Sequence, residues 1–178
     1  RRVDTPPVGG GAGLIMKVQP IVDAIKDAKS ANSHVILLSP RGKTYTQNTA
    51  KRLANCAEIV LVCGHYEGVD ERVSAYVDEE ISIGDFVLTG GEIAAMAIAD
   101  SLIRLQKGAI TSSSLDEESF ESGMLEYPQY TEPYDYEGRR VPDILYSGNH
   151  AAISKWRKKQ ALYITRLYRP DLFAKLKL

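Results

Sequence analysis

Residues 81–92 read ISIGDFVLTGGE and join an apolar segment to a pair of glycines. The apolar residues from Ile81 to Leu88 predict a strand, and the segment Ile93–Gln106 that follows at once predicts a helix. Two glycines between a strand and a helix allow the backbone to approach another group closely. They also leave the first helical N–H groups free to face an anionic or polar group. The local pattern favours a tight strand-to-helix turn, and a ligand site is the alternative.

Two further apolar runs, Val35–Leu38 and Glu58–Cys63, predict buried strands. The helical segments predicted around the strands are Leu14–Lys29, Thr46–Asn55 and Arg72–Val77. Apolar strands that alternate with helices predict an α/β fold with a parallel sheet covered on both faces. Ligands bind beyond the carboxyl ends of such strands. We therefore expect one pocket to draw on Leu37–Pro40, Gly64–Gly68 and Leu88–Gly91.

A second, smaller domain is predicted toward the C-terminus. Residues 110–122 contain serines and carboxylates without an apolar face, which predicts a flexible linker between a domain of residues 1–109 and a helical domain of residues 123–178. In the helical domain, Asn149 is expected to cap a helix that continues to about Leu162, with a further helical piece to Leu167. The residues expected to form its buried stripe are Ile153, Trp156, Tyr163 and Leu167.

The charge is distributed unevenly along the chain, although its net value is only −1. Residues 1–110 carry 12 basic and 13 acidic side chains, residues 111–147 carry 2 and 9, and residues 148–178 carry 8 and 1. A basic terminal segment is typical of a surface that binds a polyanion such as nucleic acid. A solvated helix face is the alternative. The candidate phosphate-binding residues are Lys155, Arg157, Lys158 and Lys159.

Several common sites are excluded by spacing. Residues 9–13 read GGGAG, but the dinucleotide fingerprint requires glycine where Leu14 stands, and the phosphate-loop motif that would end at residues 42–44 requires glycine where Leu37 stands. The three histidines have no partner at zinc-ligand spacing, so no metal site is predicted, and no Gly-x-Ser-x-Gly motif is present. Two cysteines, no signal peptide and no long apolar run predict a reduced cytoplasmic protein that does not enter a membrane.

Several long motifs occur in order along the chain. They are GHYEGVDER at residues 64–72, IGDFVLTGGE at residues 83–92, and SGNH at residues 147–150 with Trp156 and Arg157 downstream. These motifs closely resemble those of the bacterial tRNA (guanine-37-N1)-methyltransferases, the TrmD family of the SPOUT superfamily. Residues 7–13 (PVGGGAG) and 127–130 (YPQY) resemble the family pattern as well. The resemblance covers essentially all 178 residues, but family members usually carry several tens of additional residues before the glycine-rich loop.

The resemblance implies a SPOUT-type α/β domain with a C-terminal trefoil knot that binds S-adenosylmethionine, followed by a small basic helical domain that binds tRNA. It also implies a cytoplasmic homodimer whose active site is shared between the subunits, and it leaves a role for Mg²⁺ open. The residues that match the family's cofactor site are Leu37, Leu38, Pro40, Gly64, Tyr66, Glu67, Ile83, Gly84, Phe86, Leu88, Gly90 and Gly91.

The implied reaction transfers a methyl group to N1 of guanine 37 in the anticodon loop. Because N1 of neutral guanine carries a proton, a carboxylate base should remove it, and a cation near O6 should stabilise the developing charge. Arg104 matches the family's arginine for the second task. The family's base is an Asp that directly precedes Ser-Phe in the linker. In this chain Glu118 stands at that position, with Asp116 and Glu117 as nearby substitutes.

Two other functions stay open at the level of sequence. One is a methyltransferase of the same superfamily that acts on ribosomal RNA or on a 2′-hydroxyl and does not need a carboxylate base at Glu118. The other is a non-catalytic RNA-binding module, which would bind tRNA without affinity for S-adenosylmethionine.

Overall fold

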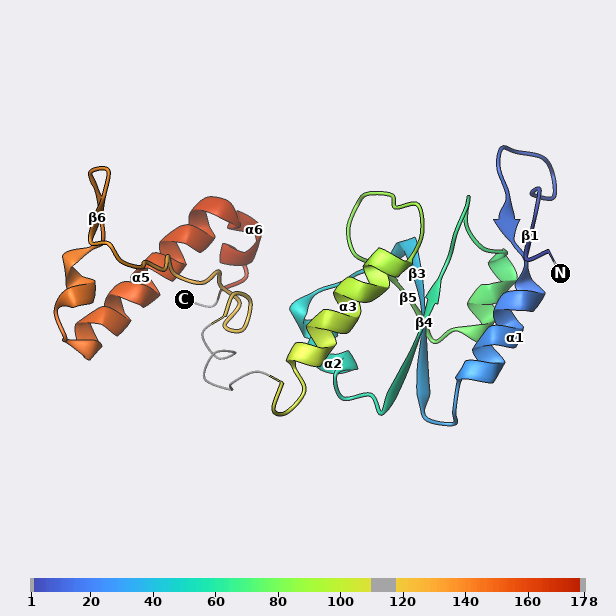
Figure 1. Ribbon diagram of the computed structural model, residues 1–178, viewed down its shortest axis with the longest axis horizontal. Helices are drawn as coiled ribbons and strands as arrows, with labels where there is room; N and C mark the ends of the chain where they lie inside the picture. The colour runs from blue at the N-terminus through green and yellow to red at the C-terminus, as the bar shows by residue number, and fades with distance from the viewer. Residues whose placement is uncertain (1, 110–117, 177–178) are drawn as a thin grey trace. The chain divides into compact units, whose positions relative to one another are not determined.

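The chain forms two compact units, residues 1–110 and residues 111–178. The computed structural model describes residues 2–109 and 118–176 (Figure 1). Asp116 and Glu117, named above as substitutes for Glu118, lie outside the described residues. Each unit is considered by itself below.

A parallel sheet forms the centre of the first unit. Its strands lie in the order β4 (Glu58–Cys63), β3 (Ser33–Thr44), β5 (Glu79–Ser82), and both pairs are parallel. The predicted parallel sheet is therefore confirmed, and the bounds of β4 are those expected from the sequence.

The two faces of β3 are covered by different helices, as Figure 1 shows. Alternate side chains of a strand point to opposite faces. Ile36 and Leu38 pack in one cluster with α2 (Gln47–Leu53) and α3 (Glu92–Arg104). The opposite cluster contains Val35 and Leu37 with residues of α1 (Val18–Ala28) and of the 3₁₀ helix η1 (Glu71–Tyr76). Each fully buried aliphatic side chain contributes about 1.5–3 kcal/mol, so the sheet and its helices form a stable frame for the loops.

The third strand is shorter than predicted. β5 ends at Ser82, whereas the apolar run predicted a strand to Leu88, and Phe86 and Val87 are 53% and 84% exposed. The strand ends here because its last pairing with β3 joins Thr44 to Ser82. The Ser82 hydroxyl then closes a turn, accepting from the amide of Gly84 and donating to its carbonyl oxygen. Residues 83–91 are consequently a loop.

β3 is longer than the predicted strand Val35–Leu38 because it continues beyond an irregularity. Leu38 and Lys43 both pair with Ile81, so residues 39–42 make an excursion away from the sheet and return to it. A Cβ atom at Gly42 would lie 2.5 Å from the Ile81 amide nitrogen, so glycine is required where the excursion closes.

A short hairpin precedes the first helix, and the sequence did not predict it. β1 (Asp4–Thr5) pairs with β2 (Ile15–Met16), so the helix predicted from Leu14 begins only at Val18. Met16 donates its amide to the Gly68 carbonyl oxygen and accepts from the Asp70 amide, which attaches the hairpin to the segment after β4.

The second unit is built around one long helix. α5 (His150–Tyr168) is followed by α6 (Pro170–Phe173) and preceded by the hairpin of β6 (Asp135–Tyr136) and β7 (Arg139–Arg140) and by the 3₁₀ helix η2 (Asp143–Tyr146). The predicted cap is confirmed, because Asn149 Oδ1 accepts from the Ala152 amide at 3.1 Å. The two predicted helical pieces are a single helix.

The predicted buried stripe of α5 is wrong in its second half. Tyr163 and Leu167 are 61% and 55% exposed, and the buried positions are instead Ala161 and Thr165. Side chains four apart share a helix face, so these two continue the face of half-buried Ile153. Thr165 is a polar side chain, and hydropathy alone therefore assigns it to the wrong side.

Candidate functional site

A cavity of about 360 Å³ lies at the carboxyl ends of the three strands of the first unit. Its lining comes from the excursion of β3, from the segment after β4 and from the loop after β5. All twelve residues that the sequence assigns to cofactor binding belong to this lining. The tertiary structure thus brings together residues that are up to 54 positions apart, from Leu37 to Gly91.

The glycine pair of the opening motif is fixed to the end of β4. The Gly91 amide donates to the Gly64 carbonyl oxygen at 3.0 Å, and His65 forms a β-bridge with Gly90. A Cβ atom at Gly91 would lie 2.8 Å from the Cα atom of Cys63, which no real side chain tolerates. The close approach expected of these glycines is found, and the group approached is the backbone of β4.

His65, which lines the cavity, forms a polar contact with Glu92, the first residue of α3. His65 Nε2 lies 2.5 Å from Glu92 Oε1, and this hydrogen bond lowers the pKa of the Glu92 carboxyl. This pair is not among the predicted site residues. Its signal was available, because His65 directly follows the predicted end of a strand and Glu92 opens the next helix, where a carboxylate is favoured.

Tyr66 adopts a left-handed backbone conformation at the cavity wall, with φ of 59°. Its hydroxyl hydrogen-bonds the Asp4 carboxylate of β1, and the pKa of Tyr66 is raised chiefly by this bond. Next to it, Glu67 donates its amide to the Leu14 carbonyl oxygen. A Cβ atom at Gly13 would lie 2.5 Å from the Glu67 side chain. The glycine-rich segment therefore sits directly against the cavity residue Glu67.

Arg41 is the one Lys or Arg side chain among the described lining residues of this cavity. Its Nε and Nη2 atoms each lie 2.8 Å from a carboxylate oxygen of Glu80, and its Nη1 atom lies 2.5 Å from Glu71. These hydrogen bonds, above all that with Glu80, raise the pKa of Arg41, and Arg41 in turn lowers the pKa of Glu80. The positive charge is thus engaged by carboxylates, and the cavity is poorly suited to a phosphate group.

Arg104 lies at the far end of α3 from this cavity. Gly91 caps the helix at the cavity, and Arg104 is its last residue. Thirteen helical residues rise by about 20 Å, and Arg104 does not belong to the cavity lining. Within a single chain the structure therefore does not bring Arg104 to the cofactor residues.

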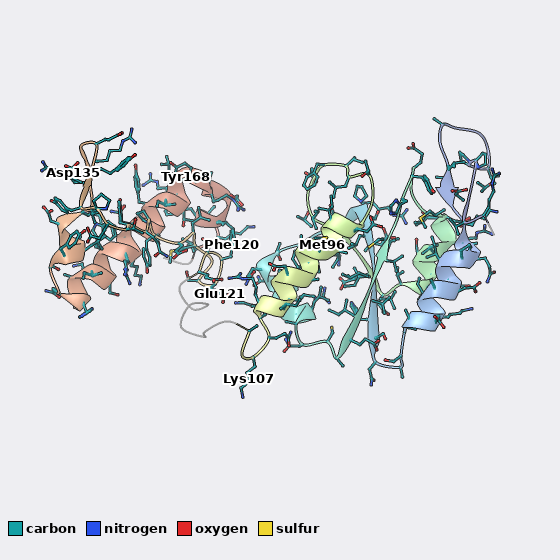
Figure 2. All side chains as sticks on the ribbon, viewed as in Figure 1. Met96, Lys107, Phe120, Glu121, Asp135 and Tyr168 are labelled. Carbon is teal, nitrogen blue, oxygen red and sulfur yellow. The ribbon has the colours of Figure 1, made fainter. Side chains whose placement is uncertain are left out.

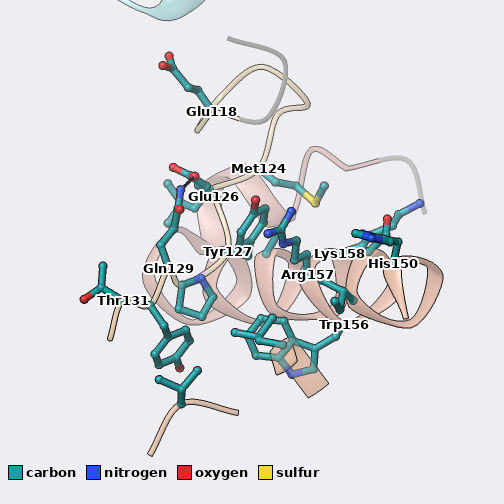
Figure 3. Close-up of a pocket in the computed structure, with 18 of the residues that line it drawn as sticks. Glu118, Met124, Glu126, Tyr127, Gln129, Thr131, His150, Trp156, Arg157 and Lys158 are labelled. Atoms are coloured by element: carbon teal, nitrogen blue, oxygen red, sulfur yellow. Dashed lines mark hydrogen bonds between the residues drawn. The ribbon is translucent and has the colours of Figure 1, made fainter. Parts of the chain in front are cut away.

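A second cavity, of about 770 Å³, lies in the C-terminal unit (Figure 3). Glu118, Arg157 and Lys158 belong to its lining, whereas Lys155 and Lys159 are exposed on α5 outside it. The Arg157 guanidinium carbon lies 4.7 Å from the centre of the Tyr127 ring. The carboxylate of Glu118 points away from the other labelled side chains in Figure 3.

Within residues 2–109 and 118–176, no group of three or more His, Cys, Asp or Glu side chains is arranged to hold a metal ion. Over the same ranges, no helix is long and apolar enough to cross a membrane.

Comparison with known proteins gives a consistent result. The family model described as "tRNA (Guanine-1)-methyltransferase TrmD" matches residues 1–175. The chain is 57% identical over 180 residues to the tRNA (guanine-N(1)-)-methyltransferase of Clostridium botulinum strain Kyoto, covering 100% of the chain and 75% of that protein. The enzymes of the same name from Clostridium acetobutylicum and Clostridium perfringens are 57% and 55% identical, covering 99% and 100% of the chain and 74% and 76% of those proteins. The chain therefore belongs to the TrmD family of tRNA (guanine-1)-methyltransferases.

Proposed function

We propose that this protein is a methyltransferase that moves a methyl group from S-adenosylmethionine to N1 of guanine 37 in the anticodon loop of tRNA. One observation carries the proposal: the twelve residues that match the family's cofactor motifs line a single cavity. Family membership and the names of its relatives support the same reaction.

The chemistry of the cavity fits S-adenosylmethionine, which carries no phosphate. Its only described Lys or Arg, Arg41, is engaged by Glu71 and Glu80, which disfavours a nucleotide phosphate. The loop 83–91 lines the cavity and is proposed to meet the adenine through main-chain groups, and the Glu67 carboxylate suits hydroxyl or cationic groups. When bound, this donor supplies a methyl group already activated by a sulfonium. The protein mainly has to hold guanine N1 in line with that methyl group.

Glu118 and Arg104 are the proposed catalytic residues. Glu118, as a carboxylate, accepts the N1 proton, and Arg104 stabilises the negative charge that develops toward O6. Arg104 is half-buried at the end of α3 and is not part of the cofactor cavity, so a site completed by a second subunit is consistent with its position.

The exposed face of α3 supports a homodimer. Ile93, Met96 and Ile103 are 60%, 70% and 62% exposed, and Phe86 and Val87 of the preceding loop are exposed as well. Figure 2 marks Met96 on this helix. Contiguous exposed apolar side chains of this kind favour contact with another protein surface, and a second copy is the partner that the family resemblance implies.

The remaining parts of the proposal concern the knot, the tRNA and the compartment. The excursion of β3 at residues 39–42 and the loop 83–91 held on β4 are compatible with a trefoil knot in the first unit. Exposed Lys155, Lys158 and Lys159, together with half-buried Arg157 beside the Tyr127 ring, are proposed to bind tRNA phosphates. The enzyme is proposed to act in the cytoplasm, where its tRNA substrate is found.

The decisive test has two steps. Calorimetric titration with S-adenosylmethionine is expected to give one site per chain, and a phosphate-bearing nucleotide such as ATP is expected to bind far more weakly. Transcripts with guanine at position 37 are then expected to be methylated, and matched transcripts with adenine there are not. Binding of tRNA without binding of S-adenosylmethionine would instead support the non-catalytic RNA-binding module.

A further inference from the structure

The cavity of the second unit is walled by aromatic rings from two segments. Tyr127 and Tyr130 come from the chain before β6, and Trp156 comes from α5. The centres of the Tyr130 and Trp156 rings lie 6.5 Å apart at 51°, and Tyr130 is 46% exposed. A ring that is held against a neighbour and still open on one side offers a stacking surface.

The wall is anchored to the long helix beneath it. The Leu125 amide donates to Thr165 Oγ1 at 2.8 Å, and the Glu126 amide donates to Ser119 Oγ at 2.9 Å. Thr165 is fully buried. The segment that carries Tyr127 and Tyr130 is therefore tied to α5 within the second unit, so the aromatic wall exists before any ligand binds.

Charge inside this cavity does not favour a phosphate. Its Lys and Arg side chains are Arg157 and Lys158, and its carboxylates are those of Glu118, Glu126 and Glu132. Without Glu118, whose carboxylate points away from the other labelled side chains (Figure 3), the positive and negative charges are equal in number, so the lining offers an anion no net attraction. A neutral planar group with hydrogen-bond donors on its edge, by contrast, meets both rings and carboxylates. Nucleobases have this combination, and guanine, adenine and cytosine all carry edge donors.

Charge outside the cavity is positive. Lys155 and Lys159 are exposed on α5 and do not belong to the lining. Proteins that bind single-stranded nucleic acid contact its phosphates with cationic side chains and stack its bases on aromatic side chains. Lysines outside this cavity and aromatic rings inside it give the same arrangement.

The geometry points to a second nucleobase site. This cavity holds one unstacked base of the anticodon loop, stacked on Tyr130 and Trp156, while neighbouring phosphates contact the exposed lysines of α5. The walls of the cavity lie entirely within the second unit. Glu118, the proposed base for the methylated guanine, also belongs to the lining, but its carboxylate points away from the other labelled side chains (Figure 3). Its role toward that guanine therefore does not place the guanine on the rings, and the proposed occupant is another base of the loop. The assignment rests on the proposed function, because it takes tRNA as the substrate.

Trp156 provides a direct reporter, since it is the single tryptophan of the chain. An anticodon stem–loop RNA is titrated into the full chain. It is expected to quench the Trp156 emission, because the base stacks on the indole. A series of the same RNA with one abasic nucleotide at each loop position then identifies the base. One abasic position is expected to abolish the quenching while most of the binding remains, as measured by anisotropy of a labelled RNA.

Paired variants separate stacking from folding. Tyr130→Leu removes the ring and is expected to weaken RNA binding about tenfold, whereas Tyr130→Phe keeps the ring and the affinity. Tyr163→Leu changes an exposed tyrosine of α5 that does not line the cavity, and it serves as the matched control. Thermal unfolding of each variant shows whether the unit is intact, and an intact Tyr130→Leu variant with unchanged affinity would overturn the assignment.

Two further outcomes would also refute the site. Equal quenching by every abasic RNA would mean that no single base enters the cavity. Tryptophan emission that changes on diluting the protein without RNA would mean that a second copy of the chain covers the cavity.

Methylation is measured in parallel. A chain that methylates tRNA without quenching loses only this second site, and a chain that quenches without methylating loses only the proposed reaction.

Discussion

The amide of Gly91 donates a hydrogen bond to the carbonyl oxygen of Gly64 across 3.0 Å, which joins the loop after β5 to the end of β4. This bond joins two segments of the lining of the first unit's cavity that are 27 residues apart. It needs a residue without a side chain at position 91, because a Cβ atom there would lie 2.8 Å from the Cα atom of Cys63. The helix α3 then starts directly, with the Ala95 amide donating to the Gly91 carbonyl oxygen.

Gly91→Ala is therefore expected to destabilise the first unit by about 2 kcal/mol or more, because backbone atoms of β4 would have to move, and to abolish binding of S-adenosylmethionine. Gly90→Ala is the matched comparison. Its Cβ atom would meet the Glu92 carboxylate and the His65 ring, which are side chains that can move. Denaturant unfolding and calorimetry measure both effects, and equal stability of the two variants would contradict this explanation.

Thr165→Val is expected to lower the stability of the second unit by about 1–3 kcal/mol. The buried hydroxyl donates to the Ala161 carbonyl oxygen at 2.7 Å and accepts from the Leu125 amide at 2.8 Å, so valine would leave that amide without its partner. Thr165→Ser retains both bonds and should lose less. Thermal unfolding distinguishes the two variants, and a fully stable Thr165→Val protein would show that the bond to Leu125 is unimportant.

The ion pair of Arg41 and Glu80 predicts that the free energy of unfolding decreases at acid pH. Arg41 holds the pKa of the Glu80 carboxyl below its usual value of 4.5. A carboxyl whose pKa is lowered by folding stabilises the protein above its unfolded pKa, and this contribution is lost as the pH falls through the folded value. Wild-type stability should thus fall more steeply below pH 4.5 than that of Glu80→Gln.

The effect on stability at pH 7 should be small, since Arg41 is half exposed and water screens the pair. Asp85→Asn, which removes an equal charge at an exposed carboxylate of the same unit, is the charge-matched control in denaturant unfolding. Parallel profiles for wild type and Glu80→Gln would exclude Glu80 as a source of the acid sensitivity.

Glu118→Gln is expected to slow single-turnover methylation about 10²–10⁴-fold at saturating substrates, because the amide cannot take the N1 proton. Binding of S-adenosylmethionine should be unaffected, since Glu118 is not among the residues that match the family's cofactor motifs. Asp116→Asn and Glu117→Gln test the neighbouring acids and should retain the rate. Full activity in Glu118→Gln, together with a loss in one of the other two, would move the base to that residue.

Lys158 and Lys159 are expected to contribute to RNA binding through phosphates. Changing both to Gln should weaken tRNA binding and reduce the slope of log affinity against log salt concentration by about 1–2. The double variant of Lys26 and Lys29, exposed on or beside α1, removes the same charge from the first unit and should leave the slope unchanged. If both double variants behave alike, α5 is not the phosphate-binding surface.

Local sequence patterns determined the strand Glu58–Cys63, the helix after Gly91 and the cap at Asn149, because each depends on contacts within a few residues. The motifs of the chain also selected twelve residues that line a single cavity, since they match a family whose pattern is specific.

Tertiary contacts decided the remaining features. Only the pairing of Leu38 and Lys43 with the same residue, Ile81, shows that residues 39–42 leave the sheet, and only the end of that pairing stops β5 at Ser82 although the apolar pattern continues. Buried Thr165 escaped prediction for the same reason, because its hydroxyl is satisfied by a bond to Leu125, 40 residues away. An amino-acid pattern encodes hydrophobicity and local geometry, whereas a strand end, a close backbone approach and a buried polar side chain each depend on a partner that the fold supplies.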